Sequence, residues 1–129
     1  MNDLRLFFTD ELEELPCDAN TKAYIVTIFA KYNTTVFDLS KQSITLYYSE
    51  AKTKQDFAMF QTIADWLFYC SSIFPEHLKN ASTDYYTTVG QLSYHSCYKL
   101  IKRSWPVYDE MASCFVPLSL SARTIIQQL

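Results

Sequence analysis

Residues 57–74 read FAMFQTIADWLFYCSSIF, and this stretch decides the fold. Its apolar residues recur every three or four positions, which is the spacing of one face of an α-helix. Two such seams run along it, one including Phe60 and Leu67 and the other including Trp66. A helix that is apolar on two seams lies centrally in a bundle or under a partner subunit. We therefore predict a buried central helix over residues 54–74.

The same spacing continues on both sides of this helix and predicts further helices. Residues 43–52 fit a strand by propensity, but no neighbouring segment looks able to pair with them, so a helix is expected there too. Pro117 is expected to kink or split the last helix. Five to six helices with short connections make an all-α, compact bundle in a single domain, residues 1–129. The other helices are expected at residues 4–15, 18–32, 84–102 and from 106 onward.

The single glycine and the net charge of −3 exclude several function classes. Phosphate-binding loops and dinucleotide fingerprints need several glycines at fixed spacing, and the chain has only Gly90. We interpret Gly90 as a low point on its helix that another backbone approaches closely. An acidic chain is unsuited to covering nucleic acid or an anionic membrane, so neither is an expected partner. The acidic N-terminal segment is the reverse of a targeting peptide, which predicts a cytoplasmic or virion protein, not a secreted one.

Residue spacing also argues against a metal or redox site. The cysteines match no zinc pattern and no C-x-x-C motif, so we interpret them as reduced, small core residues. Asp10 and Glu14 have the spacing of metal ligands on a helix, but such acidic pairs are common on helix surfaces. No metal and no cofactor is expected. The four cysteines are Cys17, Cys70, Cys97 and Cys114.

Asp65 is the one acidic residue in the otherwise uncharged run of residues 57–74. It is a candidate general base, but a buried carboxylate more often accepts hydrogen bonds from tyrosine hydroxyls or caps a neighbouring helix. Tyr85, Tyr86 and Tyr94 are the candidate donors. We therefore predict a polar core made of Asp65 and these three tyrosines.

Catalysis by a paired nucleophile and base is not indicated. His95 and Cys97 are two positions apart in a predicted helix, so their side chains point to different faces. We predict that the protein is not an enzyme. A small-ligand pocket is the alternative function for the polar residues of the centre. That pocket would be formed by Asp65, Tyr69, Tyr85 and Tyr94.

The end of the helix predicted over residues 84–102 combines aromatic and basic residues. Tyr98, Lys102, Arg103 and Trp105 are a candidate protein interface. Basic residues in a last helical turn are also favoured by the helix dipole, which is the structural alternative. The chain has ten tyrosines, nine phenylalanines and two tryptophans. We expect this to be more aromatic surface than a core of this size hides, which indicates a partner surface.

The segment DWLFYCSSIFPE at residues 65–76 and its continuation to residue 94 resemble a family of short, all-helical hypothetical proteins of bacteria, with phage members also expected. The family pattern is G-D-x-x-L-F-x-S-G-F-F-P-E, then D-Y-Y-x-x-x-G-x-x-x-Y. The resemblance implies a helical fold and no particular activity. The positions that depart from the pattern include Ala64 and Ser72, which stand in place of glycine, and Ile73, which stands in place of phenylalanine. The continuation that matches consists of Asp84, Tyr85, Tyr86, Gly90 and Tyr94.

These features together predict a non-catalytic subunit of a larger homo- or hetero-oligomeric protein assembly. Its most concrete form is a phage virion component of the neck, adaptor or connector kind. Such small subunits perform no chemistry and present helices to their neighbours. The alternative is a cytoplasmic regulatory or small-ligand-binding helical module.

Overall fold

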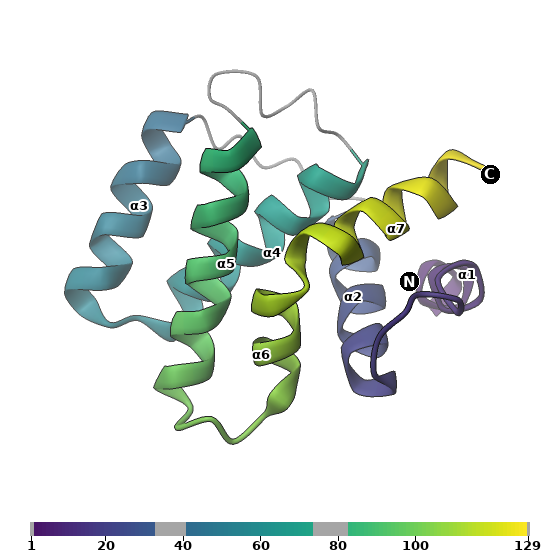
Figure 1. Cartoon of the computed structure of the whole chain (residues 1–129), viewed down its shortest axis with the longest axis horizontal. Helices are drawn as coiled ribbons and strands as arrows, with labels where there is room; N and C mark the ends of the chain where they lie inside the picture. Colours follow the sequence, from purple (N-terminus) through teal and green to yellow (C-terminus); the bar gives the residue numbers. More distant parts are fainter. Residues whose placement is uncertain (1, 33–40, 74–82, 129) are drawn as a thin grey trace.

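A computed structural model of the chain describes residues 2–32, 41–73 and 83–128. This part is compact and all-helical, with 85% of its residues in helices and no strand. The fold class is therefore as predicted, but the described residues form seven helices instead of five to six. The helices, shown in Figure 1, are α1 (Asn2–Glu11), α2 (Ala19–Tyr32), α3 (Lys41–Lys54), α4 (Phe57–Ile73), α5 (Thr83–Leu100), α6 (Pro106–Ser113) and α7 (Phe115–Gln127).

The helix count is higher because the last predicted helix is split at Cys114. A proline ring inside a helix clashes with the carbonyl group four residues earlier, which for Pro117 is that of Ser113. Ser113 is the last residue of α6, and Pro117 falls in the first turn of α7. In a first turn the missing N–H costs nothing, because it would have no partner within the helix. Pro117 therefore splits the helix, and the break lies before the proline.

α4 is the central helix, as the two apolar seams predict. It packs against α2, α3, α5 and α7, and it crosses the middle of the molecule in Figure 1. Every residue from 63 to 72 is buried. The ring of Phe68 on α4 contacts that of Phe115 on α7, with centroids 5.4 Å apart. Helices of the same chain thus cover α4, without a partner subunit; Phe74 lies outside the described residues.

Residues 43–52 are helical and belong to α3. Ile44 and Ala51 are fully buried, and the ring of Tyr48 meets that of Phe60 on α4 at 5.9 Å. This apolar contact with α4 stabilises the helical conformation of residues 43–52 and outweighs the β propensity of their sequence. The sequence pattern of residues 43–52 does not by itself indicate this packing against α4.

Most aromatic rings lie inside the molecule, contrary to our expectation of a large surplus at the surface. Among the described aromatic side chains, only Phe7 and Trp105 are classed as exposed, at 44% and 38%. Phe37 and Phe74 lie outside the described residues. The aromatic composition is thus mainly a property of the core. The fully or nearly fully buried rings are Phe8, Phe29, Tyr32, Phe60, Trp66, Phe68, Tyr69, Tyr86, Tyr94, Tyr108 and Phe115.

Gly90 of α5 is approached closely, but by a side chain and not by another backbone. A Cβ atom at Gly90 would lie 2.6 Å from Cε2 and Cζ of Phe115. That separation is well below van der Waals contact, so glycine is what allows the Phe115 ring to approach α5 this closely. No helix in the described ranges is long and apolar enough to span a membrane.

Candidate functional site

Asp65 joins three helices through one of its oxygens. Its side chain is 7% exposed, and Oδ1 accepts a hydrogen bond from the hydroxyl of Tyr94 on α5 and another from Tyr24 on α2, each at 2.7 Å. Gln61, one turn earlier on α4, donates through Nε2 to the hydroxyl of Tyr108 on α6 at 2.8 Å. The polar core therefore connects α2, α4, α5 and α6.

Burial dominates the electrostatics of this polar core. Burial raises the pKa of Asp65 to about 7, against the hydrogen bonds from Tyr24 and Tyr94 and the positive charge of Lys31, which lower it. Burial, together with the neighbouring carboxylate, also raises the pKa of the Tyr24 and Tyr94 phenols well above the ordinary range. Both phenols therefore keep their protons and act as donors at any physiological pH.

The predicted polar core is partly assembled. Asp65 and Tyr94 meet as expected, whereas the hydroxyl of Tyr85 hydrogen bonds to Thr45 on α3. Tyr86 is buried and its ring packs edge-to-face against Tyr85 at 5.4 Å. Tyr24 is the donor that sequence reasoning missed. Its only sequence signal is its position four residues before Ile28, which places it beside the inward stripe of its helix.

None of three surface cavities in the described part of the chain is lined by Asp65. Tyr69, expected in a ligand pocket, is buried and stacks on Trp66 with ring centroids 6.0 Å apart. Three surface cavities of the described part have other linings. One of about 480 Å³ lies between the start of α2 and α6 and is lined in part by Asp18 and Glu110. Asp65 thus connects helices inside the core and lines none of these three cavities.

His95 and Cys97, both within the described residues, do not form a reactive pair. His95 is exposed and Cys97 is buried, so the two lie on different faces as predicted. All four cysteines are free thiols, and two of them, Cys70 and Cys97, are buried. Burial raises the pKa of Cys17 to about 11, so little thiolate is present at neutral pH. His77 lies outside the described residues.

A groove runs between the end of α1 and α7, and we call it the acidic groove. It consists of two adjoining hollows of about 440 and 350 Å³ that share Glu14 and Ile125. Leu120 contributes to its apolar wall. Within the described ranges, no group of three or more His, Cys, Asp or Glu side chains is placed to hold a metal ion. The acidic residues that line the acidic groove are Asp10, Glu11, Glu13 and Glu14.

The candidate interface lies at the turn between α5 and α6. Three of its residues, together with the neighbouring Lys99, form a surface that we call the basic corner. The basic corner consists of Lys99, Lys102, Arg103 and Trp105. Lys102 and Arg103 are exposed and have left-handed backbones, with φ of 56° and 57°. Trp105 is 38% exposed, and its ring packs against Tyr108 at 5.4 Å. The fourth residue expected in the interface, Tyr98, is half-buried.

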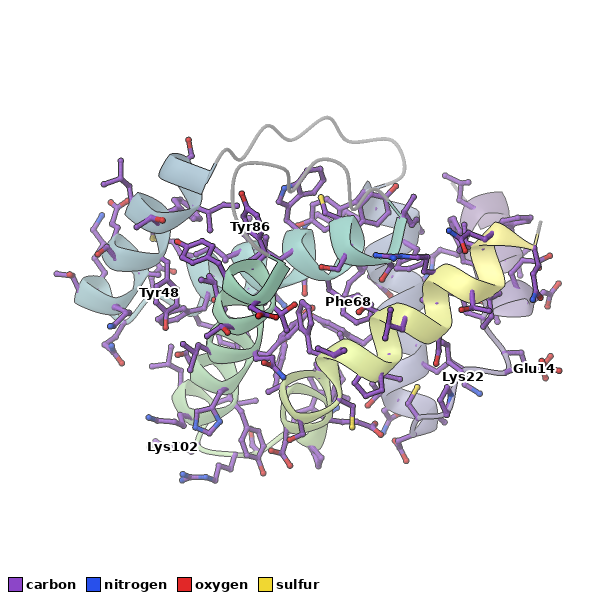
Figure 2. All side chains as sticks on the ribbon, turned by 45° about the horizontal axis from the view of Figure 1, so that its top comes forward. Glu14, Lys22, Tyr48, Phe68, Tyr86 and Lys102 are labelled. Atoms are coloured by element: carbon purple, nitrogen blue, oxygen red, sulfur yellow. The ribbon has the colours of Figure 1, made fainter. Side chains whose placement is uncertain are left out.

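Figure 2 shows that Glu14 of the acidic groove and Lys102 of the basic corner lie on opposite sides of the molecule. The two surfaces therefore cannot neutralise each other within one chain. Comparison of the chain with protein-family models, with curated proteins and with solved structures gives no match.

Proposed function

We propose that the protein is a non-catalytic subunit of a larger protein assembly. The observation that carries this proposal is the outer face of α7, which holds no charged side chain at any exposed position. The solvent face of a surface helix is ordinarily charged or strongly polar. An uncharged outer face is suited to burial against another subunit. The exposed positions of α7 are Val116, Pro117, Leu120, Thr124 and Gln127.

The position of α7 supports the same proposal. Its inner face is anchored by Phe115 and Leu118, which are buried, and by Arg123, whose guanidinium donates to the carbonyl oxygen of Ser71 on α4 at 2.8 Å. That carbonyl belongs to the last turn of α4 and lacks a partner within its own helix. α7 is therefore held firmly while its outer face, with Val116 at 39% and Leu120 at 51% exposure, stays uncovered.

The most concrete form of the proposal is a phage virion component of the neck, adaptor or connector kind. Rings in which identical subunits meet head to tail require two different contact surfaces on each subunit. The acidic groove and the basic corner are two such surfaces on opposite sides of the chain. The abundance of aromatic residues no longer supports the proposal, because the core contains most of them.

Substitution on the outer face of α7 tests the proposal. Val116→Glu puts a charge on this face, in the first turn of α7, where the helix dipole favours a carboxylate and the fold should tolerate it. We expect the wild-type chain to self-associate in sedimentation velocity experiments and Val116→Glu to weaken that association. Leu46→Glu on α3, at a residue 64% exposed, is the matched control and should leave association unchanged. A wild-type chain that sediments as a monomer, with both variants identical to it, would contradict the proposal.

The alternative is a cytoplasmic regulatory or small-ligand-binding module. The cavity of about 480 Å³ between α2 and α6 is its best location, because the polar core around Asp65 faces no described cavity. Ligand-induced protection of this cavity in hydrogen exchange, in a chain that remains monomeric, would favour this alternative over assembly.

A further inference from the structure

We infer that the acidic groove of one copy of the chain receives the basic corner of a second copy. The inference rests on the proposed assembly function and names the contact that would build it. Both surfaces are defined by described residues, and they differ in charge and in place on the molecule. Because the contact joins two different surfaces, it is of the head-to-tail type, which generates rings or filaments.

The acidic groove gathers four carboxylates at the negatively polarised end of α1. Asp10 and Glu11 end α1, where the helix dipole is negative and basic residues are normally favoured, and the last turn has none. Glu13 and Glu14 follow within three residues. In the part of the chain that the structure describes, none of the four carboxylates forms an ion pair. The Lys22 ammonium group reaches this segment, but it donates to the backbone carbonyl of Glu13 and forms an ion pair with none of the four described carboxylates. A cationic surface from another molecule would therefore stabilise carboxylates that lie against the helix dipole.

The basic corner has a strained backbone, although its cations are favourably placed at the C-terminal end of α5. The N–H of Arg103 donates to the carbonyl of Tyr98 at 2.8 Å, and the N–H of Lys102 to that of Lys99 at 2.9 Å, which is the pattern of a Schellman helix end. That motif places a residue in the left-handed region, where glycine or asparagine is normal. Here two long cationic residues stand with φ near 56°. Over the described ranges, Lys99, Lys102 and Arg103 form no ion pair.

The apolar parts of the two surfaces complement each other as well. Trp105 adjoins the cationic residues and is 38% exposed. The groove has Leu120, 51% exposed, and Ile125 on the α7 side. An indole ring seated against these aliphatic residues, with cations facing the carboxylates at the rim, is the usual anatomy of an interface with an aromatic anchor and a charged periphery.

A charge-swap experiment tests this contact. The groove variant is Glu13→Lys with Glu14→Lys, and the corner variant is Lys102→Glu with Arg103→Glu; circular dichroism verifies that both keep the native helicity. In sedimentation velocity at low ionic strength, we expect each variant alone to self-associate at least about tenfold more weakly than the wild-type chain. An equimolar mixture of the two should associate again, because the corner variant retains an acidic groove and the groove variant retains a basic corner.

The control reverses the same amount of charge at another helix end. Lys52→Glu with Lys54→Glu, in the last turn of α3, should leave association unchanged. High salt should weaken association of the wild-type chain. If Val116→Glu weakens association while both charge variants and their mixture behave as the wild-type chain, the assembly function stands and the groove-to-corner contact is wrong. A monomeric wild-type chain, or one whose groove binds only a separate lysine-rich peptide, would also overturn the inference.

Discussion

Tyr94 on α5 donates its hydroxyl hydrogen to Oδ1 of Asp65 on α4 over 2.7 Å, and Tyr94 is completely buried. Because neither group can turn to water, this hydrogen bond decides whether a carboxyl group is tolerable inside the bundle. Tyr24 donates to the same oxygen, but its side chain is only half-buried. The two donors should therefore differ in importance even though their distances are equal.

At pH 8, where most of Asp65 is ionised, Tyr94→Phe should lower the free energy of unfolding by about 1.5–3 kcal/mol, which is the range for hydrogen bonds to charged groups. Tyr24→Phe should cost less, because water can replace a hydroxyl at a half-buried position. Urea denaturation followed by circular dichroism measures both values. Tyr47→Phe on α3 is the control, since the Tyr47 hydroxyl has no hydrogen bond to a described residue. Equal losses for Tyr94→Phe and Tyr47→Phe would show that the Tyr94 bond contributes nothing.

Stability should depend on pH through Asp65. Its pKa is about 7 in the folded chain, against 3.8 for an ordinary aspartate, so the folded state keeps a proton that the unfolded state loses. The contribution of Asp65 to stability is therefore fully present below about pH 4 and is lost as the pH rises to 7. The loss is on the order of 4 kcal/mol in total and levels off above pH 7.

Asp65→Asn isolates this effect, because asparagine cannot ionise and all other titrating groups stay in place. As the pH increases from 4 to 8, the free energy of unfolding of the wild-type chain should fall relative to that of Asp65→Asn. Urea denaturation across this range measures the difference. A difference that stays constant with pH would mean that Asp65 titrates alike in the folded and unfolded chains.

The sequence predicts the centre of this fold well, because residues 57–74 carry apolar side chains on two helical seams and have no neighbour that could pair as a strand. The split at Cys114 was harder to place. Pro117 predicts a break in the helix, but the position of the break depends on the steric clash between a proline and the carbonyl group four residues before it. The Gly90 contact was predicted as a close approach, but which group approaches depends on the packing of Phe115.

The polar core and the surfaces depend more on tertiary structure. Tyr94 could be proposed as a partner for Asp65, since both belong to strongly helical segments that must pack together. Tyr24 could not, because it lies 41 residues away in sequence and its helix has more apolar inward residues beside it. The acidic groove needs α7 to lie against the end of α1, a relation between the two ends of the sequence that no local pattern contains.

Lys102→Gly should raise the free energy of unfolding by about 0.5–1 kcal/mol. Lys102 has φ of 56°, a conformation that costs an L-residue energy and glycine almost none. Thermal unfolding measures the change. Lys99→Gly is the matched control: it lies inside the last turn of α5 and should lower stability by about 1 kcal/mol. No gain from Lys102→Gly would show that the left-handed turn is not strained.

Gly90→Ala should destabilise the chain even though alanine is the better helix former by about 1 kcal/mol. The added Cβ would lie 2.6 Å from two ring atoms of Phe115, whose side chain is fully buried between Phe68 and Tyr94 and cannot easily move away. Overpacking of this kind costs about 1–3 kcal/mol, so it should outweigh the gain in propensity. Thr88→Ala, at an exposed position of the same helix, should instead be neutral or stabilising. In a Phe115→Leu background the penalty of Gly90→Ala should shrink, because the ring that it meets is gone; a Gly90→Ala chain more stable than the wild type would mean that the Phe115 ring is free to shift.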